Sequence, residues 1–281
     1  MKLHIKYLLI LTGLFFSACT NVIDVDLQNA DPRLTVEASL NWEKGTSGAN
    51  QKIRLSTSTP YFASSPNKPV TEASVKVVNT NTNEEFIFTH NGKGEYITSS
   101  FVPILNNTYI LEVEYLSEKY TGTEKMISVP DITNLSQSKE NGSNDENLEI
   151  NITFNDPKGE ENFYLLKLHR VGDVLPELIV IEDEFVDGNE VEIVYEKEED
   201  DTTDKKEIFV TGDVVDIEFF GVSNSYYNYM RILIKQSLGL DIFSPTPVAL
   251  KGNCINTTNS ENYAFGYFRL TQVEKTSYTI Q

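Results

Sequence analysis

The sequence contains very few of the residues that carry disulfide, redox or zinc chemistry. Its 281 residues include two cysteines, three histidines and one tryptophan. Cys19 and Cys254 are too few for the multi-bridge framework of a small secreted domain, so stability must come from a hydrophobic core. Neither His90 nor His169 has a second histidine, a cysteine or a carboxylate at metal-ligand spacing, so the sequence contains no zinc motif.

The usual catalytic motifs are also missing from the sequence. There is no G-x-S-x-G nucleophile elbow, no phosphate-binding glycine loop and no dinucleotide fingerprint. Acidic residues are so numerous that no pair stands out as the two carboxylates of a glycoside hydrolase. We therefore predict a protein that is not an enzyme and has no catalytic, metal-binding or cofactor-binding residues. A hydrolase is the least favoured hypothesis.

Basic residues are scarce relative to acidic ones. The chain has 23 lysines and arginines against 42 aspartates and glutamates, which gives a formal net charge of −19 at pH 7. A chain this acidic repels phosphate backbones, so nucleic acid is excluded as a partner. It also repels anionic lipid head groups, so the sequence predicts membrane attachment only through a covalent lipid.

The only long apolar run lies at the N-terminus and ends near Cys19. Residues 1–18 combine two early lysines, an apolar stretch over 7–16 and small residues before the cysteine, which is the layout of a secretory signal. The stretch is too short to span a bilayer. A cysteine at this point predicts a lipoprotein signal peptide, with cleavage before Cys19 and acylation of its thiol and new amine by chains such as palmitate. Phe16 stands where leucine, valine or isoleucine is usual, and the alternative is a plain secretory signal with an incidental cysteine.

The residue after the cysteine bears on localisation. An aspartate there is the usual signal for retention in the inner membrane, and this chain has Thr20 instead. The sequence therefore favours the outer membrane, where two or three acyl chains would hold the protein firmly. Both the periplasmic and the cell-surface face stay open.

Short β-type segments follow a tether over residues 19–33. They alternate apolar and polar residues and are separated by turn residues, including a strong hairpin signal at 91–94. The expected strands cover residues 34–40, 53–58, 74–78, 85–90, 96–99, 108–115, 119–127, 148–154, 162–170, 178–185, 190–196, 207–211, 263–273 and 277–280. The sequence therefore predicts a mainly β fold with two immunoglobulin-like or β-sandwich domains, at 34–130 and 148–281, joined by a polar linker or loop at 131–147.

One segment, residues 223–238, has helical rather than strand periodicity. Ser223 or Ser225 can cap it, apolar residues recur at helical spacing from Tyr226 onward, and Gly239 ends it. The sequence predicts a single packed α-helix in the second domain.

Three features could bind a ligand, and each has a structural alternative. The acidic run at 198–204 is either a calcium site or a solvated hairpin tip. A group of aromatic residues either stacks on sugars or packs the helix against the sheet. The group consists of Tyr226, Tyr227, Tyr229, Tyr263, Phe265, Tyr267 and Phe268. Cys254, which has no partner once Cys19 is acylated, is either a small buried residue or a reactive thiol.

Three stretches of the sequence are typical of a known family. They are CTNVIDVDL…DPRLTVEASL from Cys19, the tyrosine-rich SNSYYNYMRILIKQS, and IFSPTPVALKGNCINTTNSENYAFGYFRLTQVEKTSYTI near the end. With these stretches the chain resembles a Bacteroidetes-type lipoprotein family known as domain of unknown function 4249. Residues 253–256, reading NCIN, depart from the simpler asparagine-rich loop expected there.

The resemblance implies an outer-membrane lipoprotein with immunoglobulin-like β-domains. Genes of such proteins tend to lie beside those of TonB-dependent receptors, which implies an accessory role in nutrient uptake or surface assembly. The resemblance offers no active site, so Cys19 is the only position it assigns. We therefore expect a lipid-anchored accessory or binding protein that partners a TonB-dependent receptor. The alternative is a lipoprotein that binds a glycan or a peptide on its own.

Overall fold

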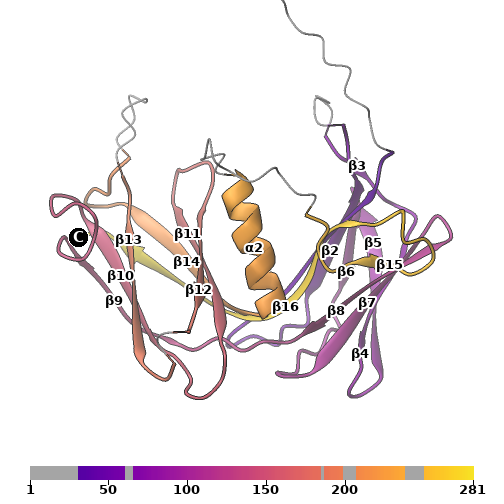
Figure 1. Cartoon of the computed structure of the whole chain (residues 1–281), viewed down its shortest axis with the longest axis horizontal. Coiled ribbons are helices and arrows are strands. Elements are labelled where there is room, and N and C mark those ends of the chain that lie inside the picture. Colours follow the sequence, from indigo (N-terminus) through magenta and orange to yellow (C-terminus); the bar gives the residue numbers. More distant parts are fainter. Residues whose placement is uncertain (1–30, 61–65, 185–186, 199–206, 238–249) are drawn as a thin grey trace, which may run out of the picture. The chain divides into compact units, whose positions relative to one another are not determined.

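The computed structural model describes residues 31–60, 66–184, 187–198, 207–237 and 250–281 (Figure 1). Several predictions made from the sequence lie outside the described residues. These are the signal peptide, the acylated Cys19, most of the tether at 19–33, residues 199–204 of the acidic run, and Leu238 at the expected end of the helix. Among the described residues, no helix is both long enough and apolar enough to cross a membrane.

The first part of the described chain folds into antiparallel strands around one hydrophobic core. The strands are β1 (Leu34–Glu43), β2 (Gln51–Thr57), β3 (Lys68–Pro69), β4 (Ser74–Asn79), β5 (Glu84–Gly92), β6 (Glu95–Thr98), β7 (Thr108–Tyr115) and β8 (Glu118–Lys125). Alternate residues point inward, as in β1, where Val36, Ala38 and Leu40 are all buried. The strand β5 pairs with β4 along its first half and with β6 along its second, so it belongs to both layers around this core.

The second part has two layers around a separate core. Its elements are β9 (Ile132–Ser138), β10 (Glu149–Asn155), β11 (Phe163–Arg170), β12 (Glu177–Glu182), β13 (Glu190–Glu196), β14 (Val214–Val222), α2 (Asn224–Ser237) and β16 (Phe265–Thr279). The short strand β15 (Ile255–Asn256) comes late in the chain but pairs with β8 of the first part. One layer is the three-stranded sheet β13-β10-β9, and the other follows the order β12-β11-β14-β16. Phe154, Tyr164 and Phe219 fill the space between the layers with mutually packed rings.

The long strand β16 takes part in both halves. Its first nine residues pair in parallel with β1, from Thr35 opposite Phe265 onward, and its later residues pair antiparallel with β14. Gly266 makes the close approach to β1 possible. It has a φ of +92°, and a Cβ atom on it would lie 2.0 Å from the Val36 carbonyl oxygen. The hydrogen-bonded order β11-β14-β16-β1 is therefore continuous.

The helix α2 covers the face of β11 and β14 that points away from the second core. Ser223 Oγ accepts a hydrogen bond from the Tyr226 backbone N–H at 3.2 Å, which caps the helix N-terminus as expected. Tyr226, Tyr227 and Met230 are buried against apolar side chains of these strands. The predicted fold class, mainly β with one packed helix, is confirmed, and the helix runs within one residue of the predicted start.

Two predictions of local structure were wrong. Residues 131–147, expected as a linker or loop, include the strand β9, which pairs with β10. The pairing shifts register between Thr153 and Phe154, and this bulge lets Ile132 and Leu135 both contact the core although they are three residues apart. The segment therefore has no period-2 pattern that sequence inspection could detect.

The second wrong prediction concerns residues 207–222. The expected strand at 207–211 is irregular backbone, and the strand β14 begins at Val214 instead. The first half of β14 alternates, with Val215 and Ile217 buried and Asp216 exposed, whereas residues 219–222 are buried on both faces, between the second core and the helix. A strand that is buried on both faces gives a continuous apolar run rather than an alternating one.

Candidate functional site

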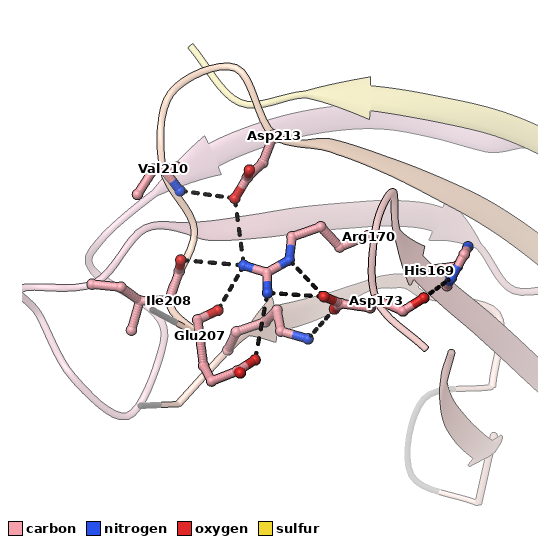
Figure 2. Close-up of polar contacts among 8 residues, drawn as sticks. His169, Arg170, Asp173, Glu207, Ile208, Val210 and Asp213 are labelled. Atoms are coloured by element: carbon pink, nitrogen blue, oxygen red, sulfur yellow. Dashed lines mark hydrogen bonds and ion pairs between the residues drawn. The ribbon is translucent and has the colours of Figure 1, made fainter. Parts of the chain in front are cut away.

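Two loops of the second sandwich are held together by one buried arginine. Arg170 ends β11, and the loop after it turns through Gly172 and Asp173 into β12. The second loop, residues 207–213, precedes β14. Figure 2 shows the Arg170 guanidinium group between the two loops.

The guanidinium group of Arg170 donates hydrogen bonds from both of its edges. Toward its own loop, Nε and Nη2 donate to Asp173 Oδ1 at 3.2 and 3.0 Å. Toward the second loop, Nη1 donates to the Glu207 carbonyl oxygen at 2.8 Å and lies 3.5 Å from Asp213 Oδ2 (Figure 2). Lys197, the residue after β13, neutralises the other oxygen of Asp173 at 2.7 Å. A planar fork of donors suits this arrangement better than a lysine would.

This network keeps Arg170 charged despite its burial. Burial alone would lower the pKa of Arg170, but the hydrogen bond and charge of Asp173, with Asp213 and Glu207, reverse this effect and raise the pKa above its usual value. Asp213 also accepts the Val210 N–H at 3.0 Å, which closes the second loop on itself. The two loops are therefore preorganised by charge-assisted hydrogen bonds.

Apolar side chains project from the same two loops into solvent. Val174 is 94% exposed and Leu175 is 77% exposed, and Val171 and Val210 are exposed beside them. A small cavity of about 230 Å³ is lined by Arg170, Val171, Gly172, Asp173, Ile208, Val210 and Asp213. Adjacent exposed apolar residues on rigid loops are typical of a surface that binds another molecule. We call Val171, Val174, Leu175 and Val210 the loop cluster.

The two histidines do not form a catalytic or metal-binding group. His169 Nε2 lies 3.0 Å from the Asp173 carbonyl oxygen and so borders the arginine network (Figure 2). His90 packs on the Tyr96 ring with the ring centres 5.3 Å apart. Neither belongs to a group of potential metal ligands among the described residues.

The aromatic residues around the helix are packing groups. The Tyr267 ring lies 4.9 Å from both Tyr226 and Tyr229, measured between ring centres, and so joins β16 to α2. Tyr226 and Tyr267 are buried, and Arg269 lies over the Tyr226 ring at 4.9 Å. For Tyr226, Tyr227, Tyr229 and Tyr267, the geometry supports packing of the helix against the sheet. The other three residues of the group lie elsewhere: Phe268 is buried in the first core, and Tyr263 packs on Phe265 with Arg33 over its ring.

Cys254 is buried against Gly122 and Phe268 in the first core. Burial raises the pKa of its thiol to about 12, so the thiol is protonated at neutral pH. Of the two interpretations of this residue, the structure supports the small buried side chain.

The sequence analysis did not predict a cluster of three aspartates that two loops form together. Asp156 lies in the loop after β10, and Asp183 and Asp187 lie between β12 and β13. Oxygens of Asp156, Asp183 and Asp187 lie within 4.8 Å of one another. These carboxylates accept hydrogen bonds from the loops themselves: Asp187 from the Gly159 N–H at 2.6 Å and Asp183 from the Asn162 N–H at 2.8 Å. The turn at residues 155–159 is visible in the sequence, but nothing there shows that a second loop supplies two more carboxylates.

The fold defines a β-sandwich protein with exposed apolar side chains on two loops of its second sandwich. The chain belongs to the family described as Domain of unknown function (DUF4249), whose sequence profile matches residues 20–277. This confirms the resemblance found in the sequence. No curated protein matches the chain.

Solved structures that resemble the chain include fibronectin type-III and FN domain segments and a DUF4785 family protein. A two fibronectin type-III domain segment from chicken tenascin is 12% identical, with a TM-score of 0.21; the match covers 70% of this chain and 89% of that one. Chicken CNTN1 domains FN1–FN3 are 10% identical with a TM-score of 0.24, covering 66% and 62%. A DUF4785 family protein from Legionella pneumophila is 11% identical with a TM-score of 0.27, covering 67% and 52%.

Proposed function

We propose that the protein is a lipid-anchored accessory protein of the outer membrane that binds a TonB-dependent receptor through the loop cluster. The observation that carries this proposal is the exposure of four apolar side chains on two loops that Arg170 holds rigid. Preorganised loops lose little conformational entropy on binding, which favours specific association. The signal sequence before Cys19 supports the anchor, and the resemblance to Bacteroidetes-type lipoproteins supports the class of partner.

The proposed mechanism is tethering. Acyl chains on Cys19 confine the protein to the membrane, and the chain from there to Arg33 extends at most about 50 Å. Confinement raises the effective concentration of the loop cluster at a receptor in the same membrane, so a weak contact is enough for stable association.

The partner can be tested by co-purification. The tagged protein is extracted in mild detergent from cells that express the TonB-dependent receptor encoded beside it. We expect the receptor to copurify with the wild type and to be lost from a Val174→Asp, Leu175→Asp double variant. Ile87→Asp is the matched control, because Ile87 is 59% exposed on β5 in the other sandwich. Equal recovery of the receptor with the double variant, or none with the wild type, would contradict the proposal.

The anchor is tested separately. Replacing Cys19 by alanine should move the folded protein from the membrane fraction to the soluble fraction. A Cys19→Ala protein that remains in the membrane fraction as before would show that the lipid is not the anchor.

A stand-alone glycan- or peptide-binding lipoprotein is the second candidate. One observation favours it: a cavity of about 570 Å³ whose lining combines hydroxyl and amide side chains with two exposed isoleucines. The lining residues are Asn50, Gln51, Lys52, Ile87, Thr89, Ile97, Thr98, Ser99 and Ser100. Binding to a glycan or peptide array in the absence of any receptor, lost in Ile87→Asp but kept in the double variant, would favour this candidate.

A further inference from the structure

Two glutamates lie side by side under the loop between β9 and β10. Glu149 and Glu196 are directly opposite each other in the antiparallel pair β10–β13. The loop folds over both: the Asn141 N–H donates to Glu149 Oε1 at 2.8 Å, and the Ser143 N–H donates to Glu196 Oε2 at 2.6 Å. As a result Glu149 has no exposed surface at all, although it carries a carboxylate.

One oxygen of this buried carboxylate has no partner. Glu149 Oε2 accepts no hydrogen bond, and the same is true of the buried amide oxygen of Asn151, two residues further along the same face of β10. The Asn151 amide nitrogen donates to Ser138 Oγ, which in turn donates to Glu149 Oε1. Within the part of the chain that the structure describes, no lysine or arginine pairs with Glu149 or Glu196. An unpaired buried carboxylate oxygen is costly unless a ligand satisfies it.

The unpaired oxygen is directed at the neighbouring carboxylate. A Cβ atom on Gly142 would lie 2.5 Å from Glu149 Oε2 and 2.4 Å from Glu196 Oε2, so the two oxygens converge on the same point. Any side chain at position 142 would occupy that point. Glycine therefore keeps open a small space between two carboxylates.

Both carboxylates accept hydrogen bonds from the loop that covers them. Glu196 Oε2 accepts from the Ser143 N–H and hydroxyl, and Glu149 Oε1 accepts from the Ser138 hydroxyl and the Asn141 N–H. Two carboxylates that face one point repel each other when both are ionised, and a cation between them removes that repulsion.

We propose that Glu149 and Glu196 bind a hard divalent cation, with calcium as the best match, and that Asn151 supplies a further oxygen. Calcium takes carboxylate, amide and carbonyl oxygens in flexible geometry, which suits this mixture of side chains. The bound ion ties the loop at 139–147 to β10 and β13.

The surroundings provide a route for the ion. A cavity of about 770 Å³ adjoins the pair and is lined by Asn141, Gly142, Ser143, Glu177, Val194, Glu196, Lys197, Glu198 and Glu207. Four of these residues are glutamates, and the single cation, Lys197, is already paired with Asp173. An acidic cavity attracts cations to the pair.

The proposal is tested by measuring calcium binding to the full chain. The protein is purified in detergent, and bound metal ions are first removed with a chelator. We expect one saturable calcium site by calorimetry, in the range of about 10⁻⁴ to 10⁻³ M that is common for extracellular modules. Calcium should raise the melting temperature by several degrees, and magnesium should raise it less. Glu196→Gln and Gly142→Ala should each abolish the calcium effect while keeping the circular dichroism spectrum of the wild type.

The aspartate cluster provides the matched control. Asp187 is exposed, so Asp187→Asn should fold normally and should keep the calcium effect. Calcium binding that is lost in Asp187→Asn and kept in Glu196→Gln would overturn the assignment. It would also be overturned if the chelated wild type took up no calcium at millimolar concentration, because the two glutamates would then share a proton rather than a metal ion.

Discussion

Replacing Arg170 by methionine tests whether one buried guanidinium group holds the loop cluster in place. Arg170 is 6% exposed, and its substitution removes the donors to Asp173, to the Glu207 carbonyl and to Asp213. Removing one partner of a buried ion pair generally costs about 3–5 kcal/mol, because the remaining charges stay buried without compensation.

The structure places the expected cost at the lower end of this range. Lys197 still neutralises Asp173 in the variant, and the side chains of Glu207 and Asp213 are 22% and 23% exposed, so water can reach them. We therefore expect the free energy of unfolding to fall by about 3 kcal/mol. Arg170→Lys should lose less, because it keeps the charge while losing the fork geometry.

Urea unfolding at neutral pH gives the measurement, and Lys167→Met is its matched control. Lys167 lies on the same strand and pairs with Glu218 at 2.8 Å, but it is 41% exposed. An exposed pair of this kind contributes about 1 kcal/mol or less. If Arg170→Met costs no more than Lys167→Met, the network does not hold the loops. In that case receptor binding should also be unaffected by the Arg170 variant.

Three further predictions concern buried groups away from the loop cluster. Cys254, with a pKa of about 12, should resist iodoacetamide in the folded protein at mildly alkaline pH and react fully in guanidinium; reaction at the same rate in both states would contradict its burial. Burial raises the pKa of Glu124, so the folded state loses stability as pH rises through the window between the unfolded and folded pKa values. Glu124→Gln should therefore raise the urea midpoint at neutral pH and leave it unchanged at acidic pH, and equal midpoints at neutral pH would count against this reasoning. Gly221→Ala should cost about 3 kcal/mol in thermal unfolding, because its Cβ would lie 1.7 Å from the Ser128 carbonyl oxygen.

The sequence predicted those elements whose two faces meet different surroundings. The strand β7 alternates buried and exposed residues, and its expected bounds of 108–115 agree with the structure. The amphipathic helix α2 was equally recognisable, because only one of its faces is buried, the face that carries Tyr226, Tyr227 and Met230. The strands β9 and β14 escaped detection for different reasons, since β9 contains a bulge and the last four residues of β14 are buried on both faces.

The candidate sites depended on contacts that sequence spacing does not encode. Arg170 and Asp173 are three residues apart, but Asp213 and Lys197 reach them from other strands and loops. The same holds for Glu149 and Glu196, which became neighbours only through the register of β10 and β13. The acidic run at 198–204 is recognisable as a possible calcium site because its charges are contiguous in the sequence. In the buried pair, Glu196 lies just before this run, but its partner Glu149 belongs to another strand.

The topology of β16 gives the loop cluster a defined separation from the start of β1, the first described strand. Thr35, near the start of β1, pairs with Phe265 at the beginning of β16. Arg170 pairs with Val215, which pairs with Tyr278 near the end of β16. The two points are therefore separated along β16 by most of a 15-residue strand, or up to about 45 Å if the strand is straight. Because the order β11-β14-β16-β1 is continuously hydrogen-bonded, this separation is built into the sheet. A partner that binds the loop cluster would thus contact a part of the sheet that is far from the start of β1.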